Sequence, residues 1–166
     1  MQHGCHLSGR TYVWQHVLQA INPRAGMTLI LGENGSGRTY WCHQLQKEYK
    51  HAYTMSCHRS TNIMNVLKQF AHFFDIPIQL EPLTVEEHVQ QILSVLHVSQ
   101  TYYVCIDNAD WLSDDALDML LRLAGYSEHY KIHIILLVLI FVNRPAKIPN
   151  RCLDACLLIN PMIKLC

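Results

Sequence analysis

The chain has 166 residues, of which 50% are hydrophobic and 16% are charged, and this length suits one domain with its own hydrophobic core. The 13 basic and 13 acidic residues cancel to a formal net charge of zero, which argues against nucleic acid as a partner. The longest apolar run, residues 134–142, is rich in β-branched side chains and has less than half of the about 20 residues that a membrane-spanning helix needs. We therefore expect no membrane-spanning segment.

The N-terminal segment, MQHGCHLSGR, has no apolar signal core, and we expect residues 1–10 to be disordered. Seven cysteines are spread along the chain without a C-x-x-C pair, which predicts reduced thiols and a cytoplasmic location. Two groups could contribute to a metal site, but neither has the spacing of four ligands: His3 with Cys5 and His6, and Cys152 with Cys156. We interpret both groups as ordinary residues.

The first predicted helix covers residues 11–21, where apolar side chains recur at helical intervals, and residues 22–26 break it. Two aromatic side chains in it, Tyr12 and Trp14, could stack on a nucleotide base, but core positions are favoured for both. The first strand follows from Met27 to Leu31, because Met27, Leu29, Ile30 and Leu31 make this run mainly apolar.

A glycine-rich turn, GENGSGRT, follows the first strand at residues 32–39. It matches the phosphate-binding pattern G-x-x-x-x-G-K-[S/T], with Arg38 in place of the lysine. The N–H groups of such a loop form an anion nest, to which the helix predicted from Arg38 to about Tyr49 adds positive partial charge. The pattern predicts that ATP phosphates are bound by Gly32, Glu33, Asn34, Gly35, Ser36, Gly37, Arg38 and Thr39, with the Thr39 hydroxyl on Mg²⁺. The alternative is a turn that binds nothing.

The middle of the chain predicts a short strand, two helices and a linker. The strand covers Ala52 to Met55, and the first helix covers Thr61 to Phe74 with its apolar residues on one side. Residues 75–83 contain two prolines and form the linker. Thr84 then begins a helix, and Glu87 three residues later predicts a capping box.

An apolar strand from Tyr102 to Asp107 ends in a carboxylate, which suits a group that holds Mg²⁺ from just beyond its innermost ligands, opposite Thr39. The alternative is an aspartate that only caps the turn. Asn108 comes next, and its amide can orient water but cannot accept a proton as a base would. Asp110 is a carboxylate, but we expect it in the following turn. With the missing lysine, these departures favour ATP binding over turnover.

The remaining elements are a helix, a long strand and a short strand. The helix runs from Ser113 to Leu123 and is stopped by Gly125, and the strands cover residues 132–142 and 155–159. Strands therefore alternate with helices, and the apolar strands do not alternate with polar residues along their length. This pattern predicts an α/β fold, with a parallel sheet covered by helices on both faces.

Ligands of parallel sheets bind at the carboxyl ends of the strands, where the loop at 32–39, Asp107 and Asn143 are expected to converge. The Asn143 amide could contact the γ-phosphate, or it could simply occupy a turn before a proline. Arg144 and Arg151 could reach a phosphate held by a neighbouring molecule, although structural or solvent-exposed positions are favoured for both.

Over residues 12–161 the chain resembles the AAA+ P-loop ATPases, and within them the ExeA-type secretion ATPases and the DamX-type ATPase domain of cell division. The likeness rests on the glycine loop, on FFDIP followed by TVEEHVQQIL, and on YYVCIDNADWLSDDALDMLLRL. It implies a three-layer P-loop NTPase fold of the AAA+ ASCE type, with ATP and Mg²⁺ as ligands. It also implies that the loop is Walker A, that Asp107 is the Walker B carboxylate, and that Asn108 and Asn143 occupy the catalytic glutamate and sensor-1 positions.

The resemblance also implies how the chain is organised and what it does. Residues 1–166 are expected to form a single AAA+-like nucleotide-binding core, truncated after the core sheet and without the helical lid. The expected function is ATP binding with weak or absent hydrolysis in secretion or cell-envelope processes, through self-association or a protein partner. The alternatives are an active ATPase of that type and a DNA-associated ATP-binding regulator like the transposition or initiator ATPases.

Overall fold

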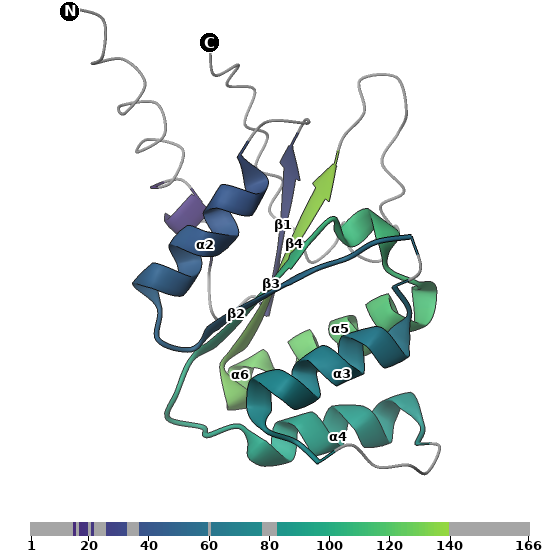
Figure 1. The fold of residues 1–166 in the computed structure, drawn as a ribbon. Helices are drawn as coiled ribbons and strands as arrows, with labels where there is room; N and C mark the ends of the chain where they lie inside the picture. Colours follow the sequence, from purple (N-terminus) through teal and green to yellow (C-terminus); the bar gives the residue numbers. More distant parts are fainter. Residues whose placement is uncertain are drawn as a thin grey trace, which may run out of the picture.

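The computed structural model describes residues 15, 17–19, 21, 26–32, 37–59, 61–77 and 83–139. The elements follow one another in Figure 1 as β1 (Met27–Gly32), α2 (Arg38–Glu48), β2 (Ala52–Ser56), α3 (Ile63–Phe74), α4 (Val85–Val95), β3 (Tyr102–Asp107), η2 (Ala109–Trp111), α5 (Asp114–Gly125), α6 (Ser127–Tyr130) and β4 (Ile132–Leu139). The described residues between 15 and 19 are helical. No helix in these ranges is both long enough and apolar enough to cross a bilayer.

The four described strands form one parallel sheet in the order β1-β4-β3-β2. The strand that comes last in the chain, β4, therefore lies between β1 and β3. Helix α2 covers one face of this sheet, and α3, α4 and α5 lie on the other (Figure 1). The predicted three-layer arrangement of a parallel sheet between helices is confirmed.

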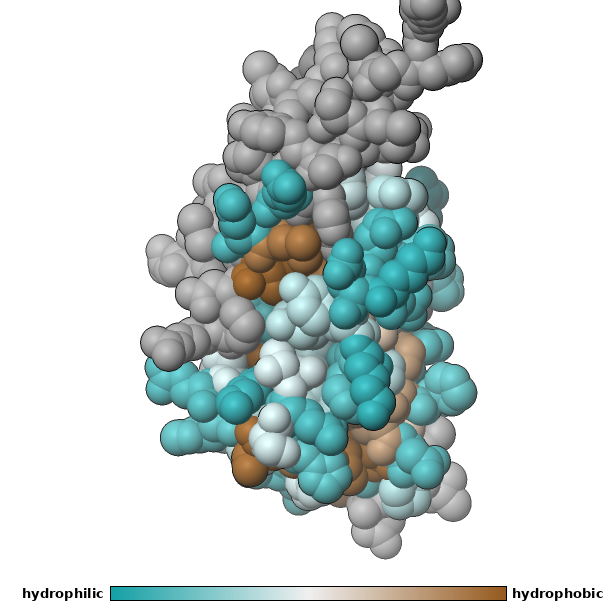
Figure 2. Space-filling view, turned by 90° about the vertical axis from the view of Figure 1, so that its left-hand side faces the viewer, coloured by the Kyte–Doolittle hydropathy of each residue, from teal (hydrophilic) through white to brown (hydrophobic). Residues whose placement is uncertain are grey.

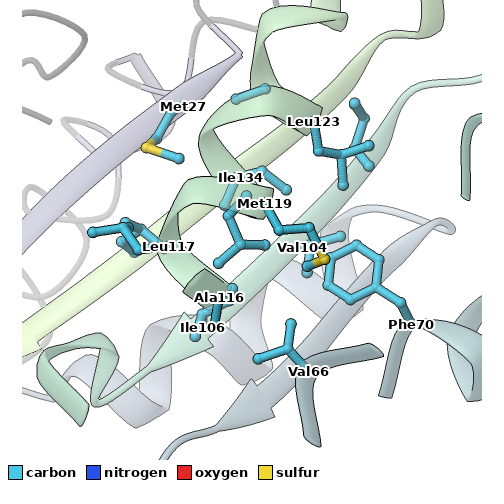
Figure 3. Close-up of a cluster of buried hydrophobic side chains, with 14 of the residues drawn as sticks. Met27, Val66, Phe70, Val104, Ile106, Ala116, Leu117, Met119, Leu123 and Ile134 are labelled. Carbon is cyan, nitrogen blue, oxygen red and sulfur yellow. The ribbon is translucent and has the colours of Figure 1, made fainter. Parts of the chain in front are cut away.

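Alternate residues of each strand pack into two separate apolar clusters, because successive side chains of a strand point to opposite faces. In β3, Val104 and Ile106 belong to the cluster under α3 and α5, whereas Tyr103 and Cys105 belong to the cluster under α2. Figure 3 shows part of the first cluster, which is built from Met27, Val66, Phe70, Val104, Ile106, Ala116, Leu117, Met119, Leu123 and Ile134 among others. Asp107 has the same parity as Cys105, so it lies on the α2 side.

The end of α5 differs from the prediction. The helix includes Gly125 and does not stop before it, and the N–H of Tyr126 donates to the carbonyls of Leu123 and Ala124. The short helix α6 follows directly and ends at Lys131, whose φ of 50° is left-handed. The helix therefore ends at Gly125, two residues beyond the predicted Leu123, but Gly125 is not a left-handed cap, and a lysine takes the left-handed position one short helix later.

Gly26 fixes the start of β1 against the end of α5. Its φ is +70°, and a Cβ placed on it would lie 2.2 Å from the backbone oxygen of Ala124. Only a residue without a side chain fits this close approach. This contact therefore fixes where β1 begins relative to the end of α5. The strand then ends at Gly32, at the carboxyl edge of the sheet.

The described surface carries no continuous apolar area on the face shown in Figure 2, which is mainly hydrophilic with small separate hydrophobic areas. Large apolar side chains that are exposed lie on different elements: Tyr40, Met64, Val95, Val98 and Trp111. Of these, Trp111 is covered in part by the guanidinium of Arg59, 5.1 Å from its ring centre. This distribution is that of an ordinary protein surface.

Candidate functional site

The carboxyl edge of the sheet brings Thr39 and Asp107 into direct contact. The Thr39 hydroxyl donates a hydrogen bond of 2.6 Å to Oδ2 of Asp107, although the two residues are 68 positions apart in the chain. The backbone N–H of Asn108 donates to the other carboxylate oxygen at 2.9 Å. Asp107 is only 5% exposed, whereas Thr39 is exposed to solvent. The pair therefore offers a fixed carboxylate and an accessible hydroxyl oxygen at one point.

The N-terminus of α2 lies at this point and has no side-chain cap. Its N-cap residue is Gly37, in the left-handed conformation with φ 81° and ψ 19°, and no acidic residue lies in the first turn. The first N–H groups of a helix have no partner within the helix, and the helix dipole adds positive partial charge there. An anion is the ligand that such a helix end favours.

Arg38 is the first residue of α2, and its Nη1 is buried without a hydrogen-bond partner among the described residues. A buried donor that stays unpaired costs free energy, and a phosphate oxygen is a strong acceptor for a guanidinium. The fork of arginine also matches two phosphate oxygens at once. The unpaired donor, the uncapped helix end and the hydroxyl together fit a phosphate group.

The Thr39 hydroxyl and the Asp107 carboxylate fit Mg²⁺, because this ion takes oxygen ligands and is commonly held by one or two protein groups together with phosphates. Within the described ranges, no group of three or more His, Cys, Asp or Glu residues could hold a metal ion. A protein-only metal centre is therefore not formed by these residues, whereas a shared metal–phosphate site is compatible with them.

Asn108 is turned toward the neighbouring strand. Its backbone is left-handed, with φ 53° and ψ 44°, and its Nδ2 donates to the Ser56 hydroxyl at 3.3 Å. Asparagine tolerates this conformation better than most residues, and a glutamate would be strained there. Asp110 lies in η2, in the turn where the sequence places it. Asn108 therefore has a structural reason to be asparagine.

Cys57 lies just beyond β2 at the same edge, and its N–H donates to the Asp107 carbonyl at 2.9 Å. Burial, and then the nearby carboxylates of Asp110 and Asp107, raise the pKa of this thiol to about 12. The thiol therefore stays protonated at neutral pH and is a poor nucleophile. It acts as a small buried side chain of the cluster under α3 and α5.

Of the predicted site residues, the structure describes Gly32, Gly37, Arg38, Thr39, Asp107 and Asn108. Gly32 ends β1 in register with Leu139 of β4, so it lies at the same sheet edge. The other predicted residues lie outside the described part of the chain: Glu33, Asn34, Gly35, Ser36, Asn143, Arg144 and Arg151, with Tyr12, Trp14 and the two Cys and His groups.

Sequence reasoning missed Ser56, which contacts Asn108 from the next strand. Ser56 is in register with Asp107, at the end of β2. The only signal for this contact is that Ser56 ends one strand and Asn108 directly follows another. That signal is sufficient only when β2 and β3 are already known to be neighbours.

The sequence matches the AAA domain family over residues 4–143. A comparison with curated protein sequences finds no match. In structure, the chain is similar to Cdc6p from Pyrobaculum aerophilum, with a TM-score of 0.64 and 17% identity over 79% of this chain and 39% of that one. It also matches PCH-2 from C. elegans, with a TM-score of 0.45 and 13% identity over 94% of this chain and 42% of that one.

The chain spans about two fifths of the length of those two solved proteins. At 17% identity, the likeness to Cdc6p shows the fold alone, and it agrees with the predicted P-loop NTPase fold class. The match to the family supports membership in that family, because it covers most of the chain. Because the matched range extends from residue 4 to residue 143, the chain belongs to the AAA domain family of nucleotide-binding AAA+ P-loop proteins.

Proposed function

We propose that the chain binds ATP with Mg²⁺ at the N-terminus of α2 and hydrolyses it weakly or not at all. The observation that carries this proposal is the 2.6 Å contact between Thr39 and Asp107 beside an uncapped helix N-terminus. This contact joins the end of the glycine loop to the end of β3. The unpaired Nη1 of Arg38 at the same helix end supports an anionic ligand.

In this proposal the glycine loop at residues 32–39 holds the phosphates, and the Arg38 guanidinium contributes a fixed positive charge. The Thr39 hydroxyl and the Asp107 carboxylate hold Mg²⁺, which neutralises charge on the phosphate oxygens when it is bound. The N–H of Asn108 keeps the carboxylate oriented through its 2.9 Å hydrogen bond. Asn143 is proposed to contact the γ-phosphate.

We expect weak hydrolysis because Asn108 stands where a catalytic base is needed. Hydrolysis needs a group that orients water and accepts its proton, and an amide cannot accept the proton. The Asn108 amide is also engaged with Ser56, so it is held toward β2. Arg38 is a second departure, because a guanidinium is bulkier and less compact than an ammonium group. The site is therefore suited to holding ATP more than to consuming it.

We further propose a role for the bound state. The sequence resemblance to ExeA-type and DamX-type ATPases supports secretion or cell-envelope processes, with a cytoplasmic location. In this role, residues 1–166 act as one nucleotide-binding core. Nucleotide binding would control association of the chain with itself or with a protein partner, as is common for AAA+ proteins.

The binding is tested by calorimetry with Mg-ATP, and with ATP in the presence of EDTA. We expect a Kd in the micromolar to millimolar range that depends on Mg²⁺. Thr39→Val keeps the shape of the side chain but removes the metal ligand, so it should weaken Mg-ATP binding about tenfold or more. Thr54→Val in β2 is the matched control and should bind as the wild type does. A folded wild-type protein that gives neither heat nor a thermal shift would refute the proposal.

The weak turnover is tested by phosphate release from wild type and from the double variant Arg38→Lys, Asn108→Glu. We expect the wild type to be close to background and the repaired variant to gain hydrolysis. Turnover by the wild type that Asp107→Ala abolishes would instead identify an active ATPase, with Asp110 or a partner residue as the base. Turnover that survives Asp107→Ala would exclude this site as its source.

A further inference from the structure

Two buried cysteines face each other between α2 and β3. The Sγ atoms of Cys42 and Cys105 lie 2.9 Å apart, and the two side chains are 3% and 1% exposed. Both are free thiols in this structure. They belong to the cluster under α2, and apolar side chains surround them: Ile30, Trp41, Leu45, Tyr103, Ile135 and Leu137.

The two thiols join the same elements as the contact at the candidate nucleotide site. Cys42 is three residues after Thr39 on α2, so it lies on the same side of the helix one turn further along. Cys105 is two residues before Asp107 on β3, so it points to the same face of the sheet. A bond between the two sulfurs would therefore link α2 to β3 next to the pair formed by Thr39 and Asp107, on the side away from the carboxyl edge of the sheet.

The distance between the sulfurs is compatible with a bond. A disulfide has an S–S distance of about 2.05 Å, so the sulfurs need to approach by less than about 1 Å. Rotation of the two side chains is sufficient for a shift of this size. The third described cysteine, Cys57, packs in the cluster on the other face of the sheet and cannot compete for either sulfur from there.

We propose that Cys42 and Cys105 form a reversible disulfide that clamps α2 to β3. With a peroxide as the oxidant, one thiolate attacks a peroxide oxygen and the O–O bond breaks. The sulfur becomes a sulfenic acid, and the other oxygen leaves as water or an alcohol. The second thiol then attacks the sulfenic sulfur, the S–S bond forms and water leaves. Two thiols are oxidised by two electrons, and one peroxide is reduced. A dithiol reductant reverses the reaction.

The reaction is slow in the folded protein. Both sulfur-bearing side chains are almost fully buried between α2 and the sheet, so a dissolved peroxide does not reach them while the helix is in place. The bond therefore forms when α2 moves briefly away from the sheet and exposes the thiols to the oxidant. We therefore expect oxidation over minutes to hours, within the range known for protein disulfides.

The clamp is tested by treating the folded full chain with hydrogen peroxide, alkylating the remaining thiols after unfolding, and mapping peptides by mass spectrometry. We expect a peptide containing Cys42 linked to a peptide containing Cys105, and loss of the link with dithiothreitol. Because the bond closes a loop of more than 60 residues, the oxidised protein should melt about 10 °C higher than the reduced one. Cys57→Ala is the matched control and should show the same link and the same rise in melting temperature on oxidation as the wild type does.

Two results would overturn the proposal. One is full alkylation of Cys42 and Cys105 after peroxide has oxidised other thiols of the same sample, or a link from either of them to a different cysteine. The other is a melting shift that persists in Cys42→Ala, a variant that still packs in the apolar cluster but cannot form the bond. The peptide map of the wild type is decisive even if this variant does not fold. None of these measurements depends on nucleotide binding.

Discussion

The two faces of the sheet differ in kind. The face under α3, α4 and α5 carries a large apolar cluster, which Figure 3 shows in part. The face under α2 carries a smaller described cluster that contains the thiols of Cys42 and Cys105. A buried hydrogen bond of 2.8 Å between Thr28 and His133 also lies on it, and the pair of Thr39 and Asp107 lies at its upper edge.

This difference suggests that the two faces of the sheet have different roles. Apolar burial supplies most of the folding free energy, and the α3–α5 face provides the larger share of it. Polar groups in a core cost free energy unless they are paired, so their presence on the α2 face indicates another use. We infer that one face mainly stabilises the domain and that the other positions the nucleotide site.

The largest expected effect tests the stabilising face. Leu120 of α5 is fully buried in the large cluster, and Leu120→Ala should lower the free energy of unfolding by about 4 kcal/mol. Its neighbour Leu121 is only partly buried, so Leu121→Ala should cost less than about 2 kcal/mol. Urea denaturation measures both. If Leu45→Ala, on the α2 face, lowered the free energy of unfolding more than Leu120→Ala, the α3–α5 face would not be the main stabilising face.

The next effect tests the polar face through pH. Burial lowers the pKa of His133 from 6.5 to about 4, so this histidine is neutral in the folded protein. The unfolded chain binds a proton below about pH 6.5, and the folded protein does so only below about pH 4. Stability from this group is therefore present above pH 6.5 and is lost as pH falls toward 4, by about 3 kcal/mol in total. Denaturation of wild type and His133→Gln between pH 7 and pH 4 measures it.

The difference between these two proteins isolates His133 from the other titrating groups. Glutamine does not titrate and can still hydrogen-bond to Thr28. The free energy of unfolding of the wild type should therefore fall by about 3 kcal/mol relative to that of His133→Gln as the pH falls from 7 to 4. Parallel curves over this range would show that His133 is not a buried neutral group, and the α2 face would lose its most polar core position.

Gly26 tests the contact between β1 and α5. Gly26→Ala places a Cβ against the Ala124 carbonyl in a left-handed conformation, which should cost about 2 to 3 kcal/mol. Gly125 is the matched control, because a Cβ there meets nothing within 4 Å and the residue ends a helix. Gly125→Ala should be neutral or stabilising by up to about 1 kcal/mol. Equal melting temperatures for the two variants would contradict the close approach.

The smallest effect concerns the cap of α4. The Thr84 hydroxyl accepts from the N–H of Glu87 at 3.3 Å, and the Glu87 carboxylate accepts from the N–H of Thr84 at 2.7 Å. Thr84→Ala should cost about 1 kcal/mol, because the N–H of Glu87 loses its acceptor, the Thr84 hydroxyl. Ser94→Ala, at an exposed position of the same helix, should change stability by less than about 0.5 kcal/mol. Chemical denaturation resolves this difference.

Local features were predictable because their signals lie within a few residues. The capping box of Thr84 and Glu87 and the strand ending at Asp107 were predicted and are confirmed. The capping box of Asn62 and Asn65 was missed. Its N3 position, three residues after the N-cap, holds an asparagine rather than the usual Glu or Gln. The position of Thr39 beside Asp107 followed from one rule: parallel strands share their carboxyl edge.

Features that depend on strand order were not predictable from these patterns. Nothing in the apolar run of β4 shows that it inserts between β1 and β3, because pairing is a long-range choice among similar strands. Two contacts depend directly on that order or on the packing of α2. These are the hydrogen bond of Ser56 with Asn108 and the approach of Cys42 to Cys105. Sequence periodicity gives the elements, whereas their neighbours follow only from the assembled sheet.

The most direct test of the nucleotide site is the Kd for Mg-ATP of wild type and Arg38→Met, measured side by side by calorimetry. Arg38 carries the buried donor without a partner, and methionine keeps an unbranched, flexible side chain but has neither the charge nor the donors. The matched control is Lys47→Met, at an exposed position in the last turn of α2. We predict that Arg38→Met binds Mg-ATP at least about tenfold more weakly, and that the Lys47 variant binds as the wild type does. Equal affinities for wild type and Arg38→Met would contradict a phosphate site at the N-terminus of α2.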